Sequence, residues 1–345
     1  MRLRLSIAAI LVVALLLAGG ALGRPAGRPM ARSPVAATAS RGTIDYVRSI
    51  NSVREFAKPK SFWGKLTEWV AGPAENPQLL RPYGLTQDSQ GRLLVADTGQ
   101  CVVHIFDPER REYFYLRGGP REPFRSPIGV AVDAGDNIYV SDSVRARIYV
   151  FDRKGKFLRV LGDPRGGVLF QRPTGLAVDS ARRLLYVADT LRHQVLVISF
   201  DGALHNTLGR RGTGPAEFNY PTALALAGGA LYVVDAMNFR IQVLTPEGRF
   251  VRSLGRLGNR TGTLNRPKGI AVDSDGNLYV VDALFETVQV FDPQGRLLYY
   301  FGATGTAPGQ FVLPTGIYIN PRNQIFVADT YNRRVQEFRY RRMGP

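Results

Sequence analysis

Six segments of the chain share one pattern of apolar and polar positions. Each begins with Pro, one variable residue and then Gly or Ala, and continues as a run of small apolar residues. About 15 residues after the Pro, a second apolar run ends in an aspartate. The six aspartates are Asp97, Asp142, Asp189, Asp235, Asp282 and Asp329, at successive spacings of 45, 47, 46, 47 and 47 residues. Self-similarity at such a period indicates a repeat architecture.

Each repeat predicts four short strands. The first is the small-residue run, such as 129–133, and the second is the apolar run that ends in the aspartate. Alternating residues over 240–244 predict a third strand and residues 250–254 a fourth, with turns rich in Asp, Asn and Gly. Four antiparallel strands repeated radially form propeller blades. The sequence therefore predicts an all-β fold, a six-bladed β-propeller, with the small residues of the first strands at its crowded axis.

The last repeat ends at its third strand, over 335–340, so its blade needs a strand from elsewhere. Residues 46–50, Tyr-Val-Arg-Ser-Ile, closely match the predicted fourth strand Phe-Val-Arg-Ser-Leu at 250–254. We therefore expect residues 43–50 to complete the sixth blade, so that the ring is closed by an N-terminal strand. Closure removes the exposed strand edges that favour aggregation.

The repeat resembles the NHL repeat, whose pattern runs Pro-x-Gly-Ile-Ala-Val and then Tyr-Val-Ala-Asp-x-x-Asn-x-Arg-Ile. The best matches are Asp-Ala-Met-Asn-Phe-Arg-Ile over 235–241 and Asp-Thr-Tyr-Asn-Arg-Arg-Val over 329–335. Other repeats depart, because Val102, Gln194 and Thr287 replace the arginine. The resemblance covers about residues 80–340. It implies the propeller fold, with many binding functions and a few enzymes.

Residues 1–23 have a basic start, an apolar run and a stretch of small residues, which is the order of a secretory signal peptide. The apolar run is also just long enough for an uncleaved membrane anchor. Arg24, Arg28 and Arg32 follow it, and positive charge there also permits an anchor that keeps the propeller in the cytoplasm. Residues 24–42 predict a flexible tether of Pro, Ala and Arg.

Residues 43–78 hold the closing strand and an insertion, and residues 79–345 hold the six repeats. Within the insertion, Ser61 is a candidate cap for a short helix with an apolar face. We expect this helix to pack on the propeller. The alternative is an exposed contact through Trp63 and Trp69 for a partner or a membrane surface.

The charge narrows the choice of partners. The chain has 45 Lys and Arg against 28 Asp and Glu, a net charge of +17 and a pI near 10.3. Such a field attracts anionic molecules. Outside the membrane these are an anionic envelope polymer, a lipid headgroup or an acidic protein domain. Nucleic acid becomes a partner only if the propeller faces the cytoplasm.

Candidate catalytic chemistry is sparse. Relatives of the NHL family include peptide-amidating lyases that hold zinc with histidines at the channel, and such a site needs about three ligands. His104, His193 and His205 are expected on a third strand, a turn and an outer strand, so they should not converge. We predict no metal and no cofactor. Cys101, the single cysteine, lies in a valine-rich segment that predicts a buried, inert thiol in a strand.

The repeated aspartates are expected to be structural, together with the arginine five residues after some of them. They recur in every repeat, whereas a catalytic group is usually needed once. Calcium-dependent hydrolases with similar propellers would need acidic and amide side chains around the channel. The first strands here carry mostly Gly, Ala, Val, Leu and Ile.

One face of the propeller should carry the starts of the first strands and the loops between second and third strands. These positions are rich in Arg and aromatic residues and poor in acid. The candidate binding residues are Arg81, Tyr83, Arg145, Arg172, Arg192, Tyr220, Phe239, Arg266, Lys268, Phe285, Tyr331 and Arg333, and Arg147, Arg240 and Arg334 fall in the same segments. Charge and stacking together suit an anionic chain.

These patterns predict a non-enzymatic binding or assembly scaffold of the cell envelope, exported or anchored by its N-terminal segment, with an anionic or protein partner on this face. One alternative is a lyase or hydrolase that uses the central channel, which acidic side chains at the channel mouth would favour. The resemblance to propellers of animal regulatory proteins implies a second alternative, RNA binding, if the propeller faces the cytoplasm.

Overall fold

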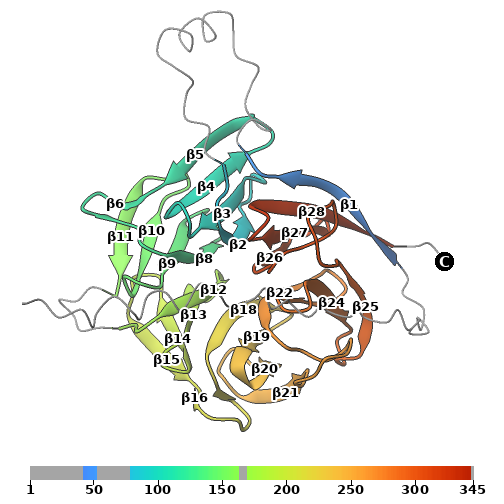
Figure 1. The fold of residues 1–345 in the computed structure, drawn as a ribbon. Helices are drawn as coiled ribbons and strands as arrows, with labels where there is room; N and C mark the ends of the chain where they lie inside the picture. Colours follow the sequence, from blue (N-terminus) through green and yellow to red (C-terminus); the bar gives the residue numbers. More distant parts are fainter. Residues whose placement is uncertain (1–41, 53–77, 163–168, 343–345) are drawn as a thin grey trace, which may run out of the picture. The chain divides into compact units, whose positions relative to one another are not determined.

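The structure is a computed structural model that describes residues 42–52, 78–162 and 169–342. In these residues, six four-stranded antiparallel sheets form a ring, and the first strand of each sheet lies nearest the centre (Figure 1). Regular helix in the described part is confined to one 3₁₀ turn, η4 (Ala236–Asn238). The predicted all-β, six-bladed propeller is thereby confirmed.

The blades follow one another along the chain, and each contains four strands in sequence order except the last. Blade 1 contains β2 (Pro82–Gln87), β3 (Leu93–Asp97), β4 (Val102–Asp107) and β5 (Glu112–Leu116), and blade 2 contains β8 (Pro127–Val132), β9 (Ile138–Asp142), β10 (Arg147–Phe151) and β11 (Phe157–Leu161). Blade 3 contains β12 (Pro173–Asp179), β13 (Leu184–Asp189), β14 (Gln194–Ser199) and β15 (Leu204–Leu208), and blade 4 contains β18 (Pro221–Ala227), β19 (Ala230–Asp235), β20 (Arg240–Leu244) and β21 (Phe250–Leu254). Blade 5 contains β22 (Pro267–Val272), β23 (Leu278–Asp282), β24 (Thr287–Phe291) and β25 (Leu297–Phe301), and blade 6 contains β26 (Ile317–Ile319), β27 (Gln324–Asp329), β28 (Arg334–Arg342) and β1 (Gly42–Ile50). Two short pairs, β6 (Gly118–Gly119) with β7 (Glu122–Pro123) and β16 (Arg210–Arg211) with β17 (Glu217–Phe218), lie in the connections between blades.

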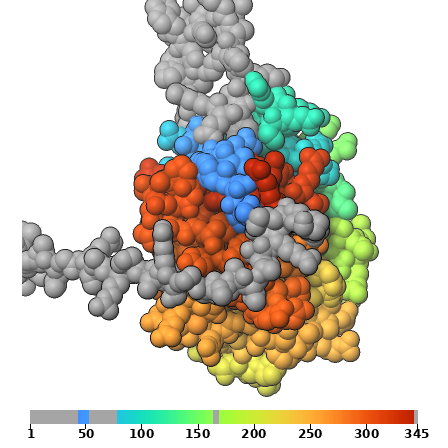
Figure 2. All heavy atoms as spheres, turned by 90° about the vertical axis from the view of Figure 1, so that its right-hand side faces the viewer, coloured from blue at the N-terminus to red at the C-terminus, as the bar shows by residue number. Residues whose placement is uncertain are grey.

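The ring is closed by β1, which pairs with β28 in antiparallel register from Gly42↔Arg342 to Ile50↔Val335. This confirms the predicted closing strand. Figure 2 shows β1 in blue at the surface, beside the red C-terminal strand. The predicted signal segment, the tether before residue 42 and the helix near Ser61 lie outside the described residues. Among the described residues, no helix has the length and apolar character needed to cross a membrane.

The core consists of clusters that join neighbouring blades. One cluster unites Tyr139 and Ile148 of blade 2 with Leu185 and Leu196 of blade 3, and five further clusters do the same around the ring. All five residues of β9 are buried, because both faces of a blade pack on a neighbour. This packing explains why the second strand of each repeat is apolar throughout rather than alternating.

Close approach between first strands explains the glycine of the Pro-x-Gly pattern. A Cβ built at Gly84 would overlap the carbonyl oxygen of Ile128 in the next blade, and one at Gly129 would overlap that of Thr174. The same clash recurs where blade 6 meets blade 1, between Gly316 and the Tyr83 carbonyl. At these junctions the predicted crowding at the axis is therefore a backbone contact that leaves no room for a side chain, whereas blade 4 has Ala223 at the equivalent position.

Candidate anion-binding face and central channel

Strand register gathers the predicted binding residues on one face of the ring. In blade 1 Pro82, which starts the first strand, pairs with Asp97, which ends the second. The same pairing recurs in blade 5 between Pro267 and Asp282. Residues just before each first strand therefore lie beside the turn between second and third strands. We call this surface the Arg-rich face, defined by Arg81, Tyr83, Arg145, Arg172, Arg192, Tyr220, Phe239, Arg266, Lys268, Phe285, Tyr331 and Arg333.

The repeated aspartates accept hydrogen bonds from backbone amides of this face. All six are fully buried. Asp97 accepts hydrogen bonds from the amides of Leu80 at 2.7 Å and Arg81 at 3.0 Å, before the first strand, and from Gly99 at 2.8 Å in the following turn. Burial would raise the pKa of Asp97, but His104 beside it and these amides outweigh that effect and lower the pKa. The expected structural role is confirmed, and these carboxylates are not available to a ligand.

Three arginines that the sequence pattern placed on this face are in fact committed to inward contacts. Arg240 Nε lies 2.8 Å from Asp235 Oδ2, and Arg334 Nε lies 2.7 Å from Asp329 Oδ2. Each guanidinium also donates to carbonyls of the preceding loop. Arg147 forms an ion pair with Glu122. The expectation that these three belong to the binding surface is therefore wrong, because each begins a third strand and turns back over the loop.

Other arginines keep their charge toward solvent. Arg81, Arg172, Arg266 and Arg333 are exposed, and none of the four has a carboxylate partner among the described residues. Arg145 donates from Nε to the Pro123 carbonyl at 2.8 Å. Arg192 lies 3.6 Å from buried Asp189. The four exposed cations are therefore the principal charges that this face offers.

Three of these cations follow the symmetry of the ring. Arg81, Arg172 and Arg266 each directly precede the proline that starts a first strand, in blades 1, 3 and 5. Ser126 and Leu313 take the equivalent position in blades 2 and 6, and blade 4 has a tyrosine. Arginine therefore alternates around the channel mouth, which spreads three guanidinium groups evenly over the face.

Exposed aromatic side chains accompany these arginines. Tyr331 is 59% exposed, and the Arg81 guanidinium lies 6.0 Å from its ring centroid. Tyr220 is exposed and packs edge-on against His193, with centroids 4.5 Å apart. Burial and the nearby Arg211 lower the pKa of His193, so its Nδ1 remains free to accept the Tyr220 amide at neutral pH. Phe239 and Phe285 are half-buried, whereas the two tyrosines present ring area for stacking.

The central channel opens on the same face and holds a cavity of about 80 Å³. Its lining comes from the first strands and is mostly glycine, aliphatic side chains and threonine. Lys268 is the one charged residue among the described residues that line it, and the lining includes no carboxylate. The lining residues are Tyr83, Gly84, Leu85, Ile128, Gly129, Val130, Gly175, Leu176, Thr222, Ala223, Leu224, Lys268, Gly269, Ile270, Thr315, Gly316 and Ile317.

The histidines lie where the sequence pattern placed them. His104 is on β4, His193 is in the turn before β14 and His205 is on the outer strand β15. None lines the channel. In the described part of the chain, no three His, Cys, Asp or Glu side chains are grouped so as to hold a metal ion.

Cys101 differs from expectation. It lies in the turn before β4 with a positive φ of 56°, and it is half-buried rather than part of a strand. Burial, with Asp142 and Asp97 nearby, raises the pKa of its thiol. The group is therefore a thiol at neutral pH, which keeps it a poor nucleophile.

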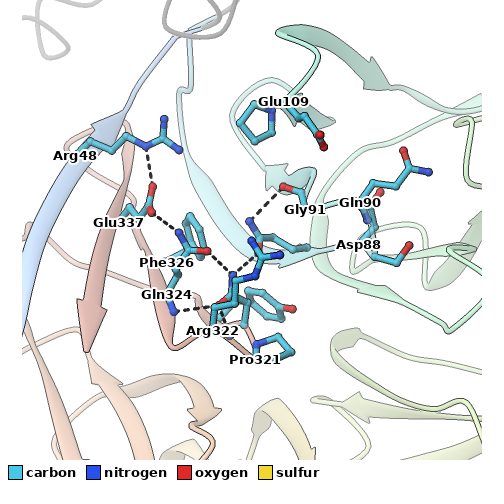
Figure 3. Close-up of a pocket in the computed structure, with 15 residues that line it drawn as sticks. Arg48, Asp88, Gln90, Gly91, Glu109, Pro321, Arg322, Gln324, Phe326 and Glu337 are labelled. Atoms are coloured by element: carbon cyan, nitrogen blue, oxygen red, sulfur yellow. Dashed lines mark hydrogen bonds and ion pairs between the residues drawn. The ribbon is translucent and has the colours of Figure 1, made fainter. Parts of the chain in front are cut away.

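A second cavity, of about 910 Å³, lies on the opposite face at the seam between blades 6 and 1 (Figure 3). Its polar side chains largely bond to one another. Arg48 Nε on β1 donates to Glu337 at 2.7 Å, and Gln324 donates to the same carboxylate at 2.9 Å. Asn320 continues the network to Gln324 at 2.7 Å and to Gln87 of blade 1 at 2.9 Å. We assign these contacts to holding the closing strand.

Comparison with known proteins agrees with the repeat pattern. The family model of the NHL repeat matches residues 124–151, 170–198, 264–291 and 311–338, which lie in blades 2, 3, 5 and 6. The chain is similar to Protein brain tumor of Drosophila melanogaster, at 28% identity over 132 residues, which is 37% of this chain and 12% of that protein. It is also similar to NHL repeat-containing protein 2 of Bos taurus, at 29% identity over 152 residues, 35% of this chain and 21% of that protein. The aligned part therefore spans about an eighth to a fifth of the length of these relatives.

Solved structures share the ring. A structure described as streptogramin B lyase superposes with a TM-score of 0.55 at 15% identity, over 76% of this chain and 94% of that one. Identity at this level shows the fold alone. The chain therefore contains four segments that match the NHL repeat, and they lie within a ring of six blades.

Proposed function

We propose that this propeller is a non-enzymatic binding scaffold of the cell envelope, and that its Arg-rich face holds an anionic polymer. One observation carries the proposal. Arg81, Arg172 and Arg266 are exposed around the channel mouth without a carboxylate partner among the described residues, while the aspartates of the same face are buried under backbone amides. These three guanidinium groups therefore face solvent without a direct ion-pair partner among the described residues.

The spacing of the charges favours an extended ligand over a compact one. Three guanidinium groups on alternate blades suit phosphate or carboxylate groups repeated along a chain. Exposed Tyr220 and Tyr331 add stacking surface between them. The net charge of +17 adds long-range attraction, which speeds encounter with any polyanion.

An envelope location is part of the proposal, and residues 1–23 support it. Protease treatment of intact cells and of spheroplasts tests it directly. Cleavage of the propeller only after the outer barrier is breached is the expected result. Protection in spheroplasts would place the propeller in the cytoplasm and make RNA the partner to pursue.

Enzyme function at the channel is the other candidate considered. A solved structure of the same fold is described as a lyase, but fold likeness does not transfer chemistry. The channel lining here offers one ammonium group, hydroxyls and apolar side chains, and no carboxylate among the described residues. General acid and base catalysis by a carboxylate pair has no residues to perform it there. Binding therefore fits the channel better than catalysis.

The triple change of Arg81, Arg172 and Arg266 to Ala tests the face. We expect the wild type to bind an acidic polysaccharide such as alginate with an affinity that falls steeply with salt, and the triple variant to bind at least about tenfold more weakly. Fluorescence anisotropy with labelled alginate measures both, and vesicles of phosphatidylglycerol and poly(U) RNA are compared as probes of the other classes.

A matched control separates this face from overall charge. Arg110, Arg153 and Arg322 are exposed in turns on the opposite face, so their change to Ala removes the same charge. The control variant should retain nearly all of the affinity. Equal losses in the two triple variants would show that net charge, and not the Arg-rich face, governs binding.

A further inference from the structure

In blades 3 and 6, a pair of threonines at the channel mouth connects the blade to the next one by hydrogen bonds. In blade 3 the Thr174 hydroxyl lies 2.8 Å from the Thr190 hydroxyl, and Thr190 donates to the Pro221 carbonyl of blade 4 at 2.7 Å. In blade 6 Thr315 and Thr330 form the same pair at 2.8 Å, and Thr330 donates to the Pro82 carbonyl of blade 1. The first threonine follows the proline of the first strand, and the second follows the buried aspartate.

Blade 4 has the first threonine of this pair but not the second. Thr222 occupies the position of Thr174, but the residue after Asp235 is Ala236, which has no hydroxyl. The Thr222 hydroxyl is buried and has no hydrogen-bond partner in the described part of the chain. A buried polar group without a partner costs free energy, which a ligand acceptor would recover.

Blade 5 departs in a complementary way. Lys268 stands at the equivalent position, and Ala283 follows the buried Asp282. Neither an ion pair nor a hydrogen bond holds the Lys268 ammonium group within the described residues. The strands that carry the two donors, β18 and β22, lie side by side at the centre of the ring (Figure 1). Two residues with unused donors thus lie on neighbouring strands and line the same part of the channel.

The surroundings suit a small anion. Thr222 and Lys268 line the same cavity of about 80 Å³, and no carboxylate lines it among the described residues. One water needs only about 10–15 Å³ of such space, so a tetrahedral oxyanion fits, whereas a polymer segment does not. The Thr222 hydroxyl is buried in the structure, so its contact with an anion in the channel requires another staggered position about the Cα–Cβ bond.

We propose that Lys268 and Thr222 form a pocket at the channel mouth for one tetrahedral oxyanion, a phosphate or sulfate group. The group is either a free ion or the terminal group of a chain that lies on the Arg-rich face. The alternative in which the group is a chain end rests on the proposed function, whereas the alternative of a free ion does not depend on it.

Isothermal titration with inorganic phosphate tests the pocket, using the full chain. The wild type should bind one phosphate per chain, and Lys268→Gln should raise the dissociation constant at least about tenfold. Thr222→Val should weaken binding several-fold, whereas Thr222→Ser, which retains the hydroxyl, should bind as the wild type does. Lys154→Gln is the matched control, because Lys154 is exposed in a turn of the opposite face. Phosphate binding that is unsaturable, or equal in Lys268→Gln and Lys154→Gln, overturns the pocket.

Tripolyphosphate distinguishes the two sources. If the pocket holds a chain end, tripolyphosphate should bind more tightly than phosphate, and the gain should vanish in the Arg81, Arg172 and Arg266 triple variant while phosphate binding stays unchanged. Equal affinity for the two ligands overturns the chain-end source and supports the free ion. Alginate binding that survives the triple change refutes the proposed polymer face and leaves the phosphate result, and hence the pocket, standing.

Discussion

At the scale of single residues, the blades differ most in how they satisfy the buried aspartate. Blades 4, 5 and 6 place a glutamine seven residues after it, and the Gln242 and Gln336 amides of blades 4 and 6 donate to Asp235 at 3.2 Å and to Asp329 at 2.9 Å. Blade 2 places Tyr149 there. The Tyr149 ring is fully buried, and its hydroxyl has no hydrogen-bond partner among the described residues. The side chain seven residues after the aspartate therefore donates a hydrogen bond to the carboxylate in blades 4 and 6, whereas in blade 2 it only fills space in the core.

Tyr149 leads to a prediction about alkaline pH. Burial raises the pKa of Tyr149 from 10.0 to about 12. The folded pKa exceeds the unfolded one, so this contribution to stability is complete below pH 10 and is lost as the pH rises from 10 to 12. We expect Tyr149→Phe to leave stability at pH 7 unchanged or slightly higher and to remove on the order of 1–2 kcal/mol of the alkaline loss. Urea unfolding at pH 7, 10 and 11.5 measures both effects.

The control for this prediction is Tyr300→Phe, because Tyr300 is 39% exposed on the outer strand of blade 5. It should follow the wild-type pH profile. If Tyr149→Phe also follows that profile, burial of this phenol does not contribute to alkaline unfolding.

At the scale of elements, the closing strand β1 depends on one buried carboxylate. Glu337 on β28 is 3% exposed and accepts from Arg48 of β1 and from Gln324 of β27. Its loss would remove one acceptor from the Gln324 amide and one from the Arg48 guanidinium. Further along the same strand pair, Arg341 and Asp45 form a solvent-exposed ion pair at 2.6 Å. The strands β1 and β28 are thus joined by one ion pair with a buried carboxylate and by a second pair that is exposed to solvent.

These two pairs give a matched comparison. We expect Glu337→Ala to lower the free energy of unfolding by about 2–3 kcal/mol, less than for a fully buried pair because the Arg48 side chain is 46% exposed. Asp45→Ala should cost less than about 1 kcal/mol, since exposed ion pairs contribute little. Guanidinium unfolding of both variants measures the difference. Equal costs would mean that the seam network does not hold the strand.

At the scale of the whole molecule, stability depends on an unbroken ring. Each core cluster belongs to two neighbouring blades, and Ile50 of β1 is part of the cluster that joins blade 6 to Leu79 and Leu85. Removal of β1 therefore opens one junction and exposes the edge of β28 to other chains. Because the blades support one another pairwise, damage at one junction weakens both neighbours.

Deletion of residues 42–50 tests this dependence. We expect the melting temperature to fall by several degrees, and the truncated chain to associate at high concentration through its open edge. Circular dichroism and size-exclusion chromatography measure the two effects. A synthetic peptide of residues 42–52 should restore the melting temperature by adding the strand in trans, whereas a scrambled peptide should not. An unaltered melting temperature after the deletion would contradict the closure.

Repetition made the fold predictable from the sequence, because six copies place the strands of every blade and show that the sixth blade lacks its fourth strand. Side-chain direction was not predictable in the same way. Arg240 and Arg334 were expected on the binding surface, but their inward turn depends on contacts with loop carbonyls. Cys101 was expected in a strand, but it takes the left-handed position of the turn before that strand.

The features that distinguish one blade from another were also missed. The unpartnered Thr222 hydroxyl lies in a blade that has Ala236 where blade 3 has Thr190, and a column-by-column alignment of the six repeats would have shown this difference. The Arg48 to Glu337 contact required the register between β1 and β28, which no single repeat contains. Sequence repetition predicts what the blades share, and packing between them decides where they differ.

The pairing of β1 with β28 also imposes an order of events on a newly made chain. During synthesis β1 emerges first among the described strands and its partner last, so the early strand waits while five complete blades and part of the sixth are translated. Until Val335 and the residues after it leave the ribosome, the nascent ring has two open edges. Chaperones would protect that intermediate, and a translational pause near the end of the message would prolong its exposure. The two strand edges are therefore protected from association with other chains only after β28 has paired with β1.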